Sequence, residues 1–355
     1  MKRKNLLKPV IVLTVVALAI AIPLLGGCRV AAPGVAPPEA EEAPTYTWKV
    51  TSVFPLAQTQ GLVKPVLEEL EEALGGRVDF ELYGAGELMP DDQVLHSLQR
   101  GTIQFGIGNC RAWGSAIDLW DLDASVAFAW NSAMEQLTLF EERGLNELYA
   151  ASYEDLGGIK WLGMAPCDPA HLMTTTPVTK YEDLAGMAIM AMGDTAPAFE
   201  EAGATMISLP WDEIYLGGQT GVIDGLCQSG ATEGYTNSWH EVFPYFLDNP
   251  FAGGGMVHWV CSEELWDSLD SDMQAIIEQG AKIFTMKALT YYYDGEPQYR
   301  QYFTVTTMPD EDFAKLREDA MERWDDVAAS SPRCAQVIEI LRDYSAEVEA
   351  AEWWR

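Results

Sequence analysis

Cysteine and histidine are scarce in this chain. Its 355 residues include six cysteines and four histidines. No two cysteines form a CxxC pair, and the histidines lack the short spacings of zinc ligands. The five cysteines after Cys28 are an odd number without a disulfide pattern, although one or two bridges remain possible. The sequence therefore predicts no metal site and no cofactor.

Motifs of common enzymes are also missing. The sequence contains no GxSxG, no HExxH and no glycine-rich loop of the kind that holds phosphates. Its acidic residues are too numerous for any single pair to indicate acid–base catalysis. We therefore expect a protein that is not an enzyme, with an extracytoplasmic enzyme as an alternative.

Basic residues are few relative to acidic ones. The chain has 22 Lys and Arg against 54 Asp and Glu, a formal net charge of -32 at pH 7. Nucleic acids and anionic membranes attract clusters of basic side chains. The composition therefore argues against a nucleic-acid partner, and a solubilising acidic surface explains the excess charge.

Only one long apolar run occurs, and it lies at the amino terminus. Four basic residues precede an apolar run over residues 10–25, and the sequence LGGC follows, ending at Cys28. This order predicts a signal peptide over residues 1–27. It resembles a lipoprotein signal in which Cys28 is acylated, and an ordinary cleaved signal is the alternative. Residues 28–45, rich in Ala, Pro and Glu, are then a flexible tether. We expect an extracytoplasmic, membrane-anchored lipoprotein, in the periplasm or on the outer face of the cell membrane.

The first part of the mature chain alternates strand-like and helix-like segments. Strands are predicted at residues 46–53, 78–83 and 102–108. Apolar residues at helical spacing over 61–74, and Pro90 at the start of a segment ending at Arg100, predict helices between them. This β-α-β-α-β order predicts a parallel sheet whose ligand-binding edge lies near Gln58 and Asn109.

A second α/β unit is predicted to begin with a strand at residue 158. Its central stretch, residues 177–228, holds three apolar runs separated by helical segments, with Gly or Pro at most junctions. We predict an α/β, bilobed fold like that of periplasmic binding proteins, with a hinge between the lobes. The predicted parts are lobe I at 46–157 with a return segment at about 252–270, lobe II at 158–251, a long helix spanning both lobes at 271–294, and a C-terminal strand and helices at 295–355.

Several segments resemble the solute-binding subunit of TRAP transporters, the DctP-like family. They are YEDLAG at 181–186, GA at 203–204 with PWDEIY at 210–215, TGVIDG at 220–225, and LWDSL at 265–269 followed by Met273 and Gln274. The resemblance covers nearly all of the mature chain. It implies a receptor that binds a small organic solute between two lobes and delivers it to membrane permease subunits. An ABC-type binding lipoprotein is the alternative, although the long helix favours the TRAP family.

The chain departs from this family where ligand carboxylates are usually held. Met190 stands at the position of the usual arginine, a second common arginine falls near Ala170, and Cys227 with Gln228 replaces a Glu-Asn pair. A carboxylate buried without a cationic partner is costly, by about 3–5 kcal/mol. Arg111, three residues after a predicted strand, is the candidate replacement. A surface arginine paired with nearby acids is the alternative.

The cleft is therefore predicted to be less charged and more aromatic than is usual in the family. Trp211 occupies a position where relatives often present an aromatic ring, and Trp259 lies near the hinge. His171 either faces the cleft or is satisfied within the second lobe. We expect an organic acid as ligand, with a cation held by ring faces as the alternative. The predicted ligand-binding residues are Gln58, Asn109, Arg111, His171, Met190, Trp211, Gln228 and Trp259.

Overall fold

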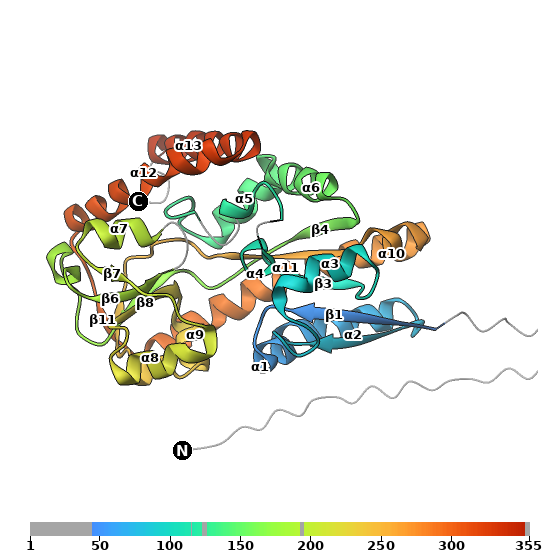
Figure 1. Cartoon of the computed structure of the whole chain (residues 1–355), viewed down its shortest axis with the longest axis horizontal. Helices are drawn as coiled ribbons and strands as arrows, with labels where there is room; N and C mark the ends of the chain where they lie inside the picture. Colours follow the sequence, from blue (N-terminus) through green and yellow to red (C-terminus); the bar gives the residue numbers. More distant parts are fainter. Residues whose placement is uncertain (1–44, 115, 123–125, 192–194, 352–355) are drawn as a thin grey trace, which may run out of the picture. The chain divides into compact units, whose positions relative to one another are not determined.

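The structure is a computed structural model that describes residues 45–114, 116–122, 126–191 and 195–351 (Figure 1). The predicted signal peptide, Cys28 and the tether up to residue 44 lie outside the described residues. Within them, every helix is too short or too polar to cross a membrane.

Five strands form the first sheet, in the order β2-β1-β3-β10-β4. They are β1 (Tyr46–Ser52), β2 (Val78–Tyr83), β3 (Phe105–Gly108), β4 (Ile159–Pro166) and β10 (Met256–Ser262). Strand β1 pairs in parallel with β2 and β3, as the β-α-β-α-β pattern predicts. Strand β10 is antiparallel to both β3 and β4. The sheet is therefore mixed, and not parallel throughout.

Strand β4 corrects the predicted boundary between the lobes. The prediction that a strand at residue 158 opens lobe II is wrong, because β4 pairs with β10 in the first sheet. Its buried side chains Ile159, Met164 and Ala165 pack into the hydrophobic core around that sheet. Apolar periodicity identifies a strand but not its partner, so the sequence could not assign this one. The chain passes to the second sheet only after Pro166.

The second sheet has six strands, in the order β11-β9-β5-β8-β6-β7. Strand β6 pairs in parallel with β7 and β8, so the three apolar runs of residues 177–228 do form neighbouring strands. Strand β5 is antiparallel to β8 and β9, and the strand predicted near residue 304 is β11. The bounds are β5 His171–Thr174, β6 Ala188–Ala191, β7 Thr205–Met206, β8 Gly225–Ser229, β9 Tyr245–Leu247 and β11 Thr304–Thr306.

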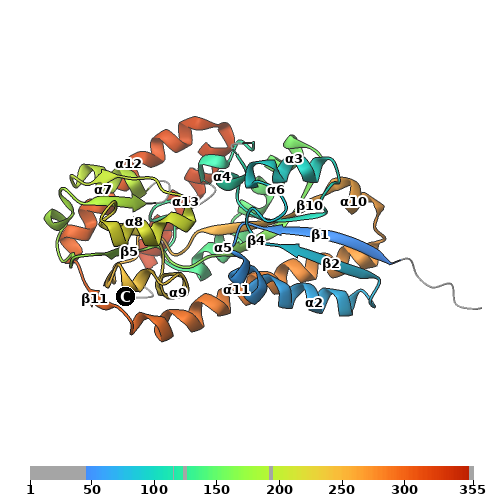
Figure 2. The same ribbon diagram turned by 60° about the horizontal axis from the view of Figure 1, so that its bottom comes forward.

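Helices pack against both sheets. In Figure 2, α2 and α11 lie side by side below the first sheet, where their apolar faces enter one core with β1, β3 and β10. The helices are α1 (Leu56–Gln58), α2 (Lys64–Ala73), α3 (Val94–Gln99), α4 (Cys110–Trp113), α5 (Ala133–Glu142), α6 (Leu145–Leu156), α7 (Ala196–Glu201), α8 (Ile214–Thr220), α9 (Ala231–Thr236), α10 (Glu263–Ser268), α11 (Ser271–Arg300), α12 (Asp310–Ser330) and α13 (Pro332–Ala351). A π-helical segment, Thr59–Val63, joins α1 to α2, and short 3₁₀ helices occupy Asp91–Gln93, Trp120–Leu122, Tyr181–Leu184, Trp211–Glu213 and Trp239–Glu241.

Helix α11 is longer than the predicted 271–294. It continues to Arg300 through Gly295 and Pro297, two residue types that usually interrupt helices, so the predicted end at residue 294 is wrong. A Cβ on Gly295 would lie 2.6 Å from Oγ1 of Thr232, so this glycine allows α11 to approach α9 closely. A proline removes a single backbone hydrogen bond from the helix. The packing of α11 on α9 therefore outweighs the tendency of Gly295 and Pro297 to end the helix.

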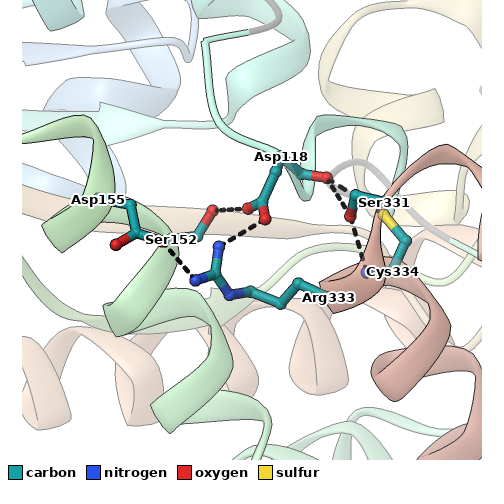
Figure 3. Close-up of polar contacts among 6 residues, drawn as sticks. All are labelled: Asp118, Ser152, Asp155, Ser331, Arg333 and Cys334. Atoms are coloured by element: carbon teal, nitrogen blue, oxygen red, sulfur yellow. Dashed lines mark hydrogen bonds and ion pairs between the residues drawn. The ribbon is translucent and has the colours of Figure 1, made fainter.

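The C-terminal helix α13 is fixed to the first-sheet side of the molecule by an arginine. Figure 3 shows Arg333 between two carboxylates, with Nη1 2.5 Å from Oδ2 of Asp118 and Nη2 2.6 Å from Oδ2 of Asp155. The hydroxyl of Ser152 donates to the other oxygen of Asp118. These contacts tie α13 to α6 and to the segment that follows α4.

Candidate ligand-binding site

A cavity of about 320 Å³ is lined by residues from both sheets. Its walls come from the segments just after β1, β3 and β4, from the end of β8, and from the start of the antiparallel strand β10. Ligands of open α/β sheets bind at the carboxyl ends of the parallel strands, and this cavity lies there. The lining residues are Val53, Phe54, Pro55, Asn109, Arg111, Ala112, Cys167, Trp211, Gln228, Glu233, Gly255, Met256 and Val257.

Four of the eight predicted ligand-binding residues line this cavity: Asn109, Arg111, Trp211 and Gln228. Asn109 and Arg111 come from the first sheet, and Gln228 lies on β8 of the second. The structure thus brings together residues more than 100 positions apart in the sequence. Their contact with a ligand stays a prediction.

Gln58 and Met190 lie outside the lining. Gln58 reaches it indirectly, because its Nε2 donates a hydrogen bond of 3.1 Å to Oε1 of Glu233. Met190 packs, half-buried, against the apolar cluster that contains Ile214 and Trp239. It therefore takes part in the core around the second sheet.

His171 and Trp259 are core residues, which corrects the predicted place of Trp259 at the cleft and, for His171, agrees with the alternative that it is satisfied within the second lobe. His171 is 5% exposed; its Nδ1 lies 2.9 Å from the carbonyl oxygen of Leu247, and its ring stacks on Phe246. Trp259 is 1% exposed and meets the ring of Phe284 edge-on. Neither side chain lines the cavity, because His171 packs on Phe246 of β9 and Trp259 packs on Phe284 of α11.

Burial of His171 gives a testable pH dependence. Loss of hydration lowers the pKa of His171 from 6.5 to about 4, so the imidazole is neutral in the folded protein. The unfolded chain takes up this proton as the pH falls below 6.5, while the folded chain resists until about 4. We expect this group to lower the free energy of unfolding by about 1–3 kcal/mol across that interval.

The measurement is urea unfolding at pH 7.5 and pH 5. His171→Asn keeps a donor for the carbonyl of Leu247 and removes the titration, so its stability should change less with pH than that of the wild type. Because all other ionisable groups are shared, the difference between the two proteins isolates His171. Equal pH dependence in both would contradict the expectation.

The local sequence explains how Arg111 reaches the cavity. A Cβ on Gly108 would lie 2.7 Å from the indole of Trp113, so glycine at the end of β3 lets that ring pack against the strand. The side chain of Asn109 then accepts a hydrogen bond of 3.0 Å from the backbone N–H of Ala112 and caps α4. This single turn fixes the backbone of Arg111 beside the strand end and leaves its side chain exposed.

Glu233 is the main lining residue that the sequence analysis missed. It is 6% exposed, and its Oε1 accepts hydrogen bonds from Gln58 and from the hydroxyl of Tyr292, at 3.1 and 3.2 Å. Burial raises the pKa of Glu233, while these hydrogen bonds oppose the rise. One signal could have identified it: an acidic residue five positions after Gln228, in the first turn after a strand that ends at the ligand edge.

Two other carboxylates lie beside Glu233. Asp168 Oδ2 accepts a hydrogen bond of 3.0 Å from the backbone N–H of Glu233, and Glu296 Oε2 accepts one of 2.8 Å from Ala231. Burial, followed by the charges of Glu233 and Glu296, raises the pKa of Asp168 well above its usual value. The lining therefore combines an exposed guanidinium with a buried carboxylate, and further buried acids lie beside that carboxylate.

The described residues contain no group of three or more His, Cys, Asp or Glu side chains arranged to hold a metal ion. Cys110, Cys167, Cys227, Cys261 and Cys334 are all thiols, so the bridges that the sequence left open do not form in the structure.

Comparison with known proteins identifies the family. The model of the bacterial extracellular solute-binding proteins of family 7, DctP, matches residues 56–331. This chain belongs to that family. Members of the DctP family are TRAP-type periplasmic receptors for small solutes, and this membership sets aside the ABC-type alternative.

Individual relatives agree with the family over most of the chain. The ectoine/5-hydroxyectoine-binding periplasmic protein UehA of Ruegeria pomeroyi is 26% identical over 332 residues, covering 90% of this chain and 89% of the relative. The C4-dicarboxylate-binding periplasmic protein DctP of Rhodobacter capsulatus is 23% identical over 270 residues, covering 73% and 77%.

A solved structure shows the same bilobed fold. It is a TRAP periplasmic solute-binding protein of Chromohalobacter salexigens with bound (S)-(+)-2-amino-1-propanol, with a TM-score of 0.81 and 28% identity, covering 88% of this chain and 99% of the other. The predicted α/β bilobed fold class is confirmed.

Proposed function

We propose that this DctP-family protein captures a small organic solute bearing a carboxylate and delivers it to the membrane permease subunits of a TRAP-type secondary transporter. Acylation of Cys28 would hold the receptor at the membrane that contains the permease. Binding of the solute is the whole of its chemical task, so we propose no catalytic residue.

The observation that carries this proposal is Arg111 at the wall of the cavity. Its guanidinium lines the cavity, and it forms no ion pair with any residue in the described part of the chain. The alternative of a surface arginine neutralised by local acids therefore lacks support. A free guanidinium can hold a carboxylate through two parallel hydrogen bonds. Arg111 would thus supply the positive charge that is missing at Met190.

The remaining lining suits a small organic molecule. The cavity volume falls within the usual range of about 300–1,000 Å³ for small-molecule sites. Phe54 and Trp211 contribute ring faces, and Asn109 and Gln228 contribute neutral polar groups. The indole N–H of Trp211 is buried without a hydrogen-bond partner among the described residues, and a ligand acceptor would satisfy it.

The known ligands of relatives support a small polar solute without choosing among them. The relative from Ruegeria pomeroyi is named for ectoine and 5-hydroxyectoine, and that from Rhodobacter capsulatus for C4-dicarboxylates. The related structure from Chromohalobacter salexigens holds an amino alcohol. Charge in the cavity must therefore decide the ligand of this chain.

Calorimetry with the Arg111→Gln variant tests the proposal. The probes are ectoine, succinate and pyruvate, each of which carries a carboxylate. We expect the affinity for whichever probe binds to fall about 10- to 100-fold, because a hydrogen-bonded charge pair contributes about 1.5–3 kcal/mol.

Arg100→Gln is the matched control, since Arg100 is exposed at the end of α3 and does not line the cavity. It should bind as the wild type does. Unchanged affinity in Arg111→Gln would show that another group holds the carboxylate, and failure of every carboxylate to bind would count against the proposed function itself.

A further inference from the structure

Glu233 is a cavity carboxylate without a cationic partner. It lines the same cavity as Arg111, and both of its side-chain hydrogen bonds at Oε1 come from neutral donors, the amide of Gln58 and the hydroxyl of Tyr292. It forms no ion pair within the described ranges of the chain. A buried carboxylate that remains ionised needs a compensating charge.

The titratable groups around Glu233 are acids, and burial, followed by the charge of Glu233, raises the pKa values of Cys167, Asp168 and Tyr292, so none of them supplies positive charge. Cys167 and Asp168 face it from the segment after β4, and Tyr292 and Glu296 face it from α11. Arg300 pairs with one member of this cluster, since its Nη1 lies 3.9 Å from Oε1 of Glu296, and it also pairs with Asp248. Among the described residues, no cation therefore pairs with Glu233 itself.

We propose that Glu233 anchors a cationic group of the ligand, so that the transported solute is a small zwitterion with its carboxylate at Arg111 and its ammonium or amidinium group at Glu233. This inference rests on the proposed function and names the class of solute. It assigns to Glu233 a role in specificity.

The same arrangement disfavours the other charge classes. A dicarboxylate held at Arg111 would bring its second carboxylate toward Glu233, where like charges repel. A simple amine would leave the guanidinium of Arg111 without its anion. The rings of Phe54 and Trp211, which line the same space, favour a cation further, because ring faces attract positive charge. A zwitterion offers a carboxylate to Arg111 and a cationic group to Glu233.

Matched ligand sets test the proposal on the full mature protein by calorimetry. One set is L-proline, pyrrolidine and cyclopentanecarboxylate; another is glycine betaine, tetramethylammonium and 3,3-dimethylbutyrate. Within each set the carbon skeleton stays nearly constant, while the ligand is a zwitterion, a cation or an anion. We expect the zwitterion of at least one set to bind about 10-fold or more tightly than both of its partners.

The Glu233→Gln variant identifies the anchor. Its amide oxygen still accepts from Gln58 and Tyr292, so the fold should be retained. We expect about 10- to 100-fold weaker binding of the zwitterion and unchanged or stronger binding of the anion. Glu200→Gln removes an exposed acid on α7, outside the cavity lining, and should alter neither.

The pH dependence separates this model from a protonated Glu233 that donates a hydrogen bond to an acid. With an ionised anchor, the wild type should bind the zwitterion more weakly as the pH falls from 8 to 5, and Glu233→Gln should lose this dependence. Asp168 and the other neighbouring acids titrate in both proteins. Stronger binding on acidification would overturn the proposal.

The remaining outcomes are decisive as well. Wild-type zwitterion affinity in Glu233→Gln overturns the role of Glu233. Binding of anions with no preference for zwitterions overturns the solute class while leaving the proposed function in place. If no ligand with a carboxylate binds, both proposals fail.

Discussion

Trp211→Ala is expected to weaken ligand binding by at least about 30-fold. Trp211 lines the cavity and packs against the buried ring of Trp239, with ring centroids 5.0 Å apart. This contact restricts the orientation of the Trp211 ring. Aromatic residues in such positions commonly contribute 2 kcal/mol or more to binding, and tenfold in affinity corresponds to about 1.4 kcal/mol. Calorimetry with the ligand that shows the strongest wild-type binding measures the effect.

Two controls keep this result interpretable. Trp211→Phe retains a ring face, so its loss should be smaller than that of the alanine variant. Trp120→Ala removes a tryptophan that is 39% exposed and lies outside the cavity lining, and it should bind normally. Affinity within about threefold of the wild type in Trp211→Ala would remove Trp211 from the site.

Gly253→Ala is expected to lower the free energy of unfolding by about 3 kcal/mol or more, at the upper end of the usual cost of overpacking. A Cβ at this position would lie 2.4 Å from the backbone nitrogen of Ser132 and 2.7 Å from the carbonyl carbon of Asn131. The two segments are also joined by hydrogen bonds from Gly253 N–H to Trp130 O and from Trp130 Nε1 to Gly254 O, both 2.8 Å. The backbone of Asn131 and Ser132 cannot move out of the way as a flexible side chain could, so the added methyl group should be costly.

Gly61→Ala is the matched control for urea unfolding. No atom lies within 4 Å of a Cβ built at Gly61, which is in the helical segment before α2. Alanine is favoured over glycine in helices by up to about 1 kcal/mol, so this variant should equal or exceed the wild type in stability. Similar stabilities of the two variants would show that the segment at Gly253 can shift at little cost.

The fold was predictable where local pattern decides it. Strand β2 has the predicted bounds, and β1 ends one residue before the predicted end, because the alternation of apolar residues is confined to each strand. The return of the chain to the first lobe at about 252–270, which contains β10, was also predicted, but the pairing of β4 with this strand was not. Both are apolar runs, but their antiparallel pairing joins residues about 100 positions apart. Such pairing depends on packing that no window of sequence contains.

The residues of the candidate site were likewise predictable only in part. Asn109 and Arg111 were predictable from the rule that loops at strand ends bind ligands, since β3 ends just before them. Trp211 and Gln228 came from resemblance to the family. Glu233 was not predicted because its environment depends on hydrogen bonds from two residues distant in the sequence, Gln58 of α1 and Tyr292 of α11. For His171 the sequence left cleft and core open, because the identity of a strand residue does not show which face of the sheet its side chain occupies.

The position of β10 carries a consequence for the order of folding. This strand lies between β3 and β4 in the first sheet, yet the chain completes most of the second sheet before reaching it. The sheet therefore cannot close until Ser262 is available, however early β1 to β4 are synthesised. Because contacts between distant residues slow folding, we expect assembly of the native state to wait for nearly the whole chain, and a truncation before β10 to leave a row of unpaired strand edges open to aggregation.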